Sequence, residues 1–277
     1  SNSEACGTSN AKVDVNLAEP RIIKGVDARP GEVPGYAMLT MTYCVRWLPF
    51  LCSTSLCGGS IWDKNTIITA AHCVVDSYKT SLKSKITVCI GAYERTNPND
   101  KKKCYIASNS YVYPMYFFNQ SYDFAVVKVD QGMDVPDLTS DGYGSTDTFC
   151  PPEENVNYRD YICRIAGFGI WKRETQMTAP ILQVAPMTIL PNEECRKVFP
   201  TVTECQICVQ GEAGETACNG DSGGPLYCFK SKGAPYHVIG ATSFGIKTCP
   251  ENGVVVYTKV ACYLDFIRDV SFQQPIL

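Results

Sequence analysis

Cysteine limits what this chain can fold into more than any other feature. Sixteen of its 277 residues are Cys, an even number that fits complete pairing. A single CxxC motif, Cys205 to Cys208, has no second pair at zinc-finger spacing, and the chain has only two histidines. We therefore expect a disulfide framework, with no metal and no cofactor, in a protein secreted into oxidising extracellular space.

Charge and hydropathy exclude two classes of partner. The formal net charge is −3 and the sequence pI about 5.5, so nothing favours binding to a nucleic acid. No apolar run is long enough for a membrane span. Hydrophobic residues make up 45% of the chain, which is enough for a substantial core. No signal peptide is visible at Ser1, and we expect it to have been removed or left out of the sequence.

Most of the chain has the pattern of an all-β protein. After a polar first segment, short runs rich in β-branched and aromatic residues alternate with turns, for example at 36–45, 85–93 and 235–245. Their spacing predicts barrels or a sandwich. Two segments predict helices: 192–199, with Asn192 as N-cap, and 261–270 near the end of the chain.

Three motifs contain the residues of a nucleophilic site. His72 lies in TAAHC, Asp123 heads the apolar run DFAVVKV, and Ser222 lies in GDSGGP. A serine needs a base and oxyanion donors to act as a nucleophile. The order His, Asp, Ser is that of chymotrypsin-type proteases. Together with CGGSIW, GFG, SFG and YTKV, these motifs make the chain resemble the chymotrypsin/trypsin family from Ile22 to about Val270.

The resemblance implies a fold and a set of catalytic roles. The fold is all-β, with two packed six-stranded antiparallel barrels and a C-terminal helix. Ser222 attacks the scissile carbonyl, His72 is the general base, and Asp123 orients the histidine. The N–H groups of Gly220 and Ser222 form the oxyanion hole. The other histidine, His237, is in no motif and is expected to be structural.

The family's activation mechanism also has its counterpart in this sequence. Cleavage between Arg21 and Ile22, in EPRIIKG, frees an amine that pairs with Asp221. The resemblance therefore implies a propeptide or light chain at 1–21, a protease domain at 22–277, and a zymogen. Many relatives have a histidine at the position of Ser55 that helps to hold the inactive state, so this chain needs another restraint.

The resemblance implies five disulfides, one of which keeps the propeptide attached: Cys57–Cys73, Cys163–Cys228, Cys195–Cys208, Cys218–Cys249 and Cys6–Cys150. The other six cysteines allow 15 connectivities. Local pairing favours Cys44–Cys52 and Cys89–Cys104, and Cys205–Cys262 follows by elimination. The insertion between Cys44 and Cys52 is expected to project near the cleft, where Trp47 and Phe50 contact a partner or pack within the loop.

The specificity pocket implied by the resemblance is shallow and uncharged. Thr216 lies at its base, where trypsin-like relatives have an aspartate, and Val255 shortens it. Its walls include Ser243, Phe244 and Gly245. We expect cleavage after Ala, Val, Leu or Met. An insertion that returns Gly253 to the wall would instead admit aromatic residues, and basic specificity would overturn the interpretation of Thr216.

The loop from Gly91 to Cys104 differs from that of many relatives, and the chain also has one N-glycosylation sequon. Many relatives bind calcium in this loop through acidic side chains. Here Ala92 occupies the position of the first ligand, so we expect no calcium. The acidic residues Glu94 and Asp100 keep calcium binding open as the alternative. The sequon is Asn119-Gln120-Ser121, in a loop beside the cleft.

Two functions remain open at this point. The first is a secreted serine endopeptidase that acts on protein or peptide substrates. Its partners would include a separate trypsin-like activating protease, because the neutral Thr216 does not favour self-cleavage after Arg21, and serpin-type inhibitors. The second is a non-catalytic, protease-like binding or adaptor protein.

Overall fold

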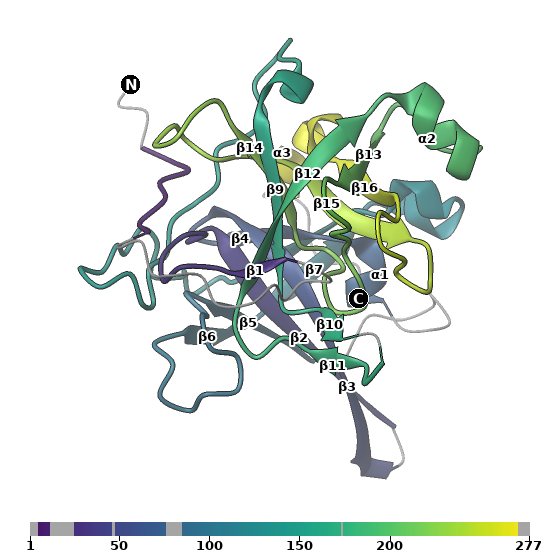
Figure 1. Ribbon diagram of the computed structural model, residues 1–277. Coiled ribbons are helices and arrows are strands. Elements are labelled where there is room, and N and C mark those ends of the chain that lie inside the picture. The colour runs from purple at the N-terminus through teal and green to yellow at the C-terminus, as the bar shows by residue number, and fades with distance from the viewer. Residues whose placement is uncertain (1–4, 12–24, 46–47, 76–84, 173, 271–277) are drawn as a thin grey trace.

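The computed structural model describes residues 5–11, 25–45, 48–75, 85–172 and 174–270, and backbone only for 45 and 48–50. Sixteen strands and a few short helices are present in these ranges (Figure 1). Arg21, Ile22, Trp47 and the side chain of Phe50 lie outside the described residues.

Seven antiparallel strands of the first half of the chain form one curled sheet. Its strands are β2 (Tyr36–Val45), β3 (Leu48–Asp63), β4 (Thr66–Thr69), β5 (Lys85–Ile90), β6 (Lys103–Ile106), β7 (Asn109–Val112) and β8 (Ala125–Lys128), in the order β6-β5-β2-β3-β4-β8-β7. The edge strands β6 and β7 are consecutive in the chain, joined by Ala107 and Ser108. The N–H of Ala107 donates to the carbonyl of Ile86, and that of Ser108 to the carbonyl of Lys128. This short link forces the sheet to curl, although no pairing joins β6 directly to β7 among the described strands.

The second half of the chain forms a closed barrel. Its strands are β9 (Ile162–Gly167), β12 (Gln183–Leu190), β13 (Gln206–Gly211), β14 (Pro225–Phe229), β15 (His237–Gly245) and β16 (Val255–Lys259). They pair in the order β12-β13-β16-β15-β14-β9, and β9 pairs back with β12 to close the barrel. The short β1 (Val26–Asp27) adds to β12 from outside, and β10 (Ile170–Lys172) pairs with β11 (Met177–Thr178) in a separate ribbon.

Three hydrophobic clusters explain why these strands stay together. One fills the curled sheet and includes Leu39 and Val88; another fills the barrel and includes Ile165 and Tyr257. The largest contains residues of both sheets, so the two units pack on each other. The chymotrypsin-like fold expected from the sequence is therefore confirmed.

The helices differ from the expectation in one detail. α2 (Asn192–Val198) begins at Asn192, so the N-cap is Pro191 and the prediction that Asn192 caps the helix is wrong. The amide of Asn192 donates instead to the carboxylate of Glu204 at 2.9 Å. The last helical segment is a 3₁₀ turn, Val260–Tyr263, followed by α3 (Leu264–Asp269).

All sixteen cysteines form disulfides. The eight bonds are Cys6–Cys150, Cys44–Cys52, Cys57–Cys73, Cys89–Cys104, Cys163–Cys228, Cys195–Cys208, Cys205–Cys262 and Cys218–Cys249. Cys6–Cys150 attaches the N-terminal segment to the body of the protein, where the N–H of Gly7 also donates to the carbonyl of Thr148.

Candidate active site

A buried carboxylate and a histidine form the centre of the site. The one-turn helix α1 (Ala71–Val74) includes His72, and the segment before β8 supplies Asp123, which is only 4% exposed. The Nδ1 of His72 lies 2.7 Å from Oδ2 of Asp123, and the backbone N–H of His72 donates to Oδ1 at 2.9 Å. The hydroxyl of Ser243 also donates to Oδ2, at 2.6 Å. These donors hold the carboxylate in one orientation.

The electrostatics of this pair suit proton transfer. Burial by itself would lower the pKa of His72, but the charge of Asp123 and its hydrogen bond outweigh burial and raise the pKa above the ordinary value. The imidazolium form is therefore stabilised, as a general base at this position would require.

Ser222 lies on a turn that both sheets hold in place. Its carbonyl accepts the N–H of Gly58, in β3, at 2.8 Å, and the next residue, Gly223, donates to the carbonyl of Thr242, in β15. Gly223 has φ of +74°, and a Cβ there would lie 2.1 Å from the hydroxyl of Thr69, three residues before His72. Only glycine allows this approach. Among the described residues, the hydroxyl of Ser222 and the ring of His72 form no hydrogen bond with each other. The distance between such groups is often long in enzymes without substrate.

The oxyanion hole expected at Gly220 and Ser222 stays a prediction, although the structure describes the backbone of both residues. Gly220 has φ of +99°, a left-handed conformation that favours glycine. Within the described chain, the N–H groups of Gly220 and Ser222 donate to no acceptor. Both are therefore available to a developing negative charge.

Asp221 is buried and lacks a cation among the described residues. Its side chain accepts the N–H of Gly169 at 2.8 Å and the N–H of Cys218 at 3.0 Å. A Cβ at Gly167 or Gly169 would lie 2.1 or 2.3 Å from its oxygens, so these glycines make room for the carboxylate. Burial raises the pKa of Asp221 from 3.8 to about 6, because an unpaired buried charge is costly.

The strand register fixes the positions of the expected pocket residues. Val255 pairs with Gly245 between β16 and β15, and its Cγ2 lies 3.6 Å from the position of a Cβ on Gly245. Gly253 precedes β16, and its N–H donates to Pro250. The hydroxyl of Thr216, a buried residue, lies 3.5 Å from the carbonyl oxygen of Gly253. Val255, and not Gly253, therefore faces Gly245.

Two residues of the SFG segment have contacts that the motif does not reveal. The Ser243 side chain donates to Asp123 and so belongs with the histidine as well as with the pocket. Phe244 is 40% exposed and packs edge-on against Phe199, with ring centroids 5.3 Å apart. Sequence reasoning missed the contact between Ser243 and Asp123, since the two residues lie 120 positions apart.

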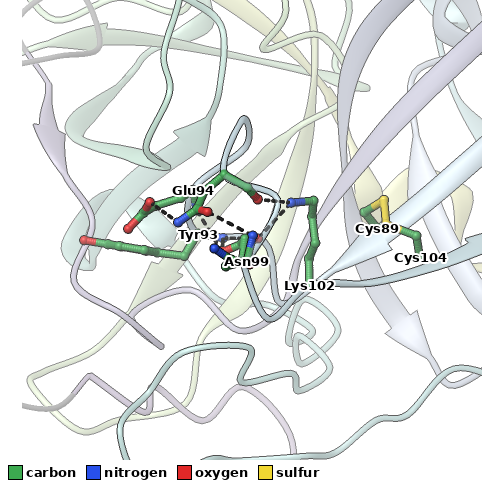
Figure 2. A network of polar contacts seen from close by, with 8 residues as sticks. Cys89, Tyr93, Glu94, Asn99, Lys102 and Cys104 are labelled. Atoms are coloured by element: carbon green, nitrogen blue, oxygen red, sulfur yellow. Dashed lines mark hydrogen bonds and ion pairs between the residues drawn. A yellow bond between two sulfur atoms is a disulfide. The ribbon is translucent and has the colours of Figure 1, made fainter.

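A lysine supports the loop between Gly91 and Cys104 from inside (Figure 2). The side chain of Asp100 is 2% exposed and accepts the N–H of Glu94 at 3.0 Å. The ammonium of Lys102 lies 3.3 Å from both this carboxylate and the carbonyl oxygen of Asn97. The amide of Asn97 in turn donates to Glu94 at 2.7 Å. A protein cation therefore already neutralises the buried carboxylate of this loop.

Other predicted positions have plainer surroundings. Asn119 is exposed and its side chain accepts the N–H of Ser121 at 2.9 Å, so the sequon lies on the surface and its glycosylation stays a prediction. His237 is buried, with Nδ1 2.7 Å from the carbonyl oxygen of Pro151 and Nε2 3.3 Å from Glu153. The described residues contain no group of three metal-ligating side chains, and none of their helices is long and apolar enough to cross a membrane.

A closed barrel packed on a curled sheet, with an aspartate–histidine pair beside a serine on a glycine-rich turn, defines the chymotrypsin-like class. The Trypsin family model matches residues 22–267, so the chain belongs to the trypsin family. Clotting factor G beta subunit of Tachypleus tridentatus is 28% identical over 236 residues, 80% of this chain and 72% of that protein. Ovochymase of Halocynthia roretzi is 26% identical over 269 residues, 95% of this chain but only 16% of that protein.

Proposed function

We propose that this chain is a secreted serine endopeptidase. The observation that carries the proposal is the 2.7 Å contact between His72 and a buried Asp123, next to the turn that bears Ser222. In this mechanism the hydroxyl of Ser222 attacks the scissile carbonyl while Nε2 of His72 takes its proton. The histidine then gives that proton to the leaving amine, and a water molecule repeats the sequence to release the acyl group.

The oxyanion of each tetrahedral intermediate would accept hydrogen bonds from Gly220 and Ser222. Both N–H groups lack acceptors in the described chain, which supports their assignment to this role. Asp123 stabilises the imidazolium formed in the same step, which agrees with the raised pKa of His72.

Activation is proposed to follow cleavage between Arg21 and Ile22. Asp221 is buried, bonded by two backbone N–H groups, and without a cation among the described residues, so a new amino terminus would supply the missing charge. Residues 1–21 would then form a light chain, attached through Cys6–Cys150 to the protease domain of 22–277. The eight disulfides favour an extracellular location.

The substrate preference is proposed to be a small or medium apolar residue before the scissile bond. Val255 faces Gly245, which supports a shallow pocket, and Thr216 offers no charge for arginine or lysine. The cut after Arg21 would therefore need a separate trypsin-like protease.

The test is covalent labelling with a fluorophosphonate, before and after cleavage at Arg21. We expect labelling of Ser222 only in the cleaved chain, together with hydrolysis of apolar peptides. Ser222→Ala is the control that should not label. A correctly cleaved chain that neither labels nor hydrolyses would favour the non-catalytic binding protein.

A further inference from the structure

The turn between β7 and β8 exposes an apolar surface. It begins with a 3₁₀ turn, Pro114–Phe117, and continues through Phe118. Met115 is 43% exposed, Phe117 50% and Phe118 85%, and Phe118 is the most exposed of the large hydrophobic residues that the structure describes. Single exposed apolar side chains are common, but a contiguous group of them requires an explanation. We call Pro114, Met115, Phe117 and Phe118 the apolar turn.

Backbone hydrogen bonds hold the apolar turn in this conformation. The carbonyl of Met115 accepts the N–H of Phe118 at 3.1 Å and the N–H of Asn119 at 2.9 Å. Tyr116 is buried in the core of the curled sheet, and its ring packs edge-on against that of Phe117, with the centroids 5.9 Å apart. Tyr116 therefore anchors the turn, while the side chains before and after it remain in solvent.

The acceptor of the one N-glycosylation sequon lies at the end of this turn. Asn119 is exposed, and the oxygen of its side chain accepts the N–H of Ser121 at 2.9 Å. This Asx turn leaves the amide nitrogen, Nδ2, without a hydrogen bond among the described residues. The residue between them is Gln120 and not a proline, so the sequon is complete. The atom that would carry a sugar is therefore available, one residue after Phe118.

The surroundings of the apolar turn are uncharged. No Asp, Glu, Lys or Arg occurs in residues 109–122, so nothing there attracts an anionic lipid surface or pairs with a charged protein. A neutral sugar suits such a surface. The ring of N-acetylglucosamine presents a face of C–H groups that can pack on an aromatic ring, while its hydroxyls stay in water.

We propose that Asn119 carries an N-linked glycan and that its first N-acetylglucosamine covers the rings of Phe117 and Phe118. The donor is an oligosaccharide joined to a lipid through pyrophosphate, and a transferase of the secretory pathway uses it. Nδ2 of Asn119 forms a bond to the anomeric carbon of the sugar while the bond from that carbon to the phosphate oxygen breaks. The lipid pyrophosphate leaves with the electron pair, and the amide nitrogen gives one proton to a base of the transferase. Neither step involves Ser222, so the glycan is independent of the proposed hydrolysis.

Mass spectrometry of the full chain, secreted from a eukaryotic host, tests the attachment. We expect most of the secreted chain to carry a glycan that peptide N-glycosidase removes, with conversion of Asn119 to aspartate. Ser121→Ala should abolish the modification, and Ser121→Thr, which keeps the hydroxyl, should retain it. A parent chain secreted mainly with unmodified Asn119 would overturn the proposal.

A double-mutant cycle tests the cover. The glycan of the uncleaved chain is trimmed to its first N-acetylglucosamine with an endoglycosidase, and unfolding in urea is measured. Loss of the sugar through Ser121→Ala should lower the folding equilibrium constant about 2–10-fold more in the parent than in Phe117→Ala/Phe118→Ala, the range for one ring-on-ring contact. Asn119→Gln should show the same coupling.

Met177→Ala, at an exposed position of β11, is the matched control and should show no coupling to either loss of the sugar. Equal effects of the sugar with and without the two phenylalanines would refute the contact.

Two other occupants of the apolar turn would give different results. Sedimentation with neutral phosphatidylcholine vesicles tests a membrane, and analytical ultracentrifugation tests a second copy of the chain. We expect the glycosylated chain to stay off the vesicles and to remain monomeric. Vesicle binding or dimerisation of the glycosylated chain that Phe117→Ala/Phe118→Ala abolishes would show that the sugar does not cover the turn.

Discussion

Replacement of Asp221 by asparagine should stabilise the uncleaved chain at neutral pH. The folded protein holds the pKa of this carboxyl near 6, about 2 pH units above its ordinary 3.8, which corresponds to about 3 kcal/mol. A raised carboxyl pKa means that the folded state binds the proton more tightly. The contribution of the protonated Asp221 carboxyl to the free energy of unfolding is thus present below pH 4 and is lost as pH rises through about 6. Asp221→Asn abolishes this loss.

The net effect at pH 7.5 includes a lost hydrogen bond. Asparagine can still accept the N–H of Gly169, but its NH₂ would face the N–H of Cys218, which costs about 1–2 kcal/mol. We therefore expect the free energy of unfolding of the uncleaved variant to exceed that of the parent by about 1–2 kcal/mol. After cleavage the sign should reverse by about 3–5 kcal/mol, because a buried amine loses its partner.

Urea unfolding, followed by tryptophan fluorescence at pH 4 and pH 7.5, measures these differences in both forms of the chain. Asp269→Asn, at an exposed position, is the control for a simple change of net charge. The reasoning is refuted if parent and variant lose the same stability between pH 4 and pH 7.5. It is also refuted if Asp221→Asn destabilises the uncleaved chain at pH 7.5.

Three further substitutions test the rest of the site. Asp123→Asn removes the charge that raises the pKa of His72, so kcat/KM should fall about 10²–10⁴-fold and the acid limb of its pH profile should move to lower pH; an unmoved limb would contradict this. Val255→Gly should raise the preference for Phe over Val before the scissile bond by about tenfold or more in competing peptides, and an unchanged ratio would exclude Val255 as the limit. Lys102→Met should lower the free energy of unfolding in urea by about 1–3 kcal/mol, because the buried carboxylate of Asp100 loses its cation. Lys101→Met, which removes an exposed ion pair with Asp141 and a contact of the ammonium with the exposed Tyr143 ring, should have little effect; equal losses would refute a special role for Lys102.

Local sequence patterns were sufficient to predict the class of fold, and they were the basis for proposing a chemistry for the motifs. Runs rich in β-branched and aromatic residues predict strands because such side chains pack well on a half-buried pleated surface, and β5 is one of these runs, with Ile86, Val88 and Ile90 buried. Sixteen cysteines and GDSGGP narrowed the class further by resemblance. Asn192 shows the limit even for a local feature, since the preceding proline took the N-cap position.

Tertiary structure alone decided which groups meet. Ser243 reaches Asp123 across 120 residues, and Gly58 meets Ser222 because the two sheets pack on each other. Lys102 neutralises Asp100 through a loop closure that no periodic pattern encodes. Sequence patterns report the faces and propensities of a segment, whereas these contacts depend on how distant segments close and pack around a shared core.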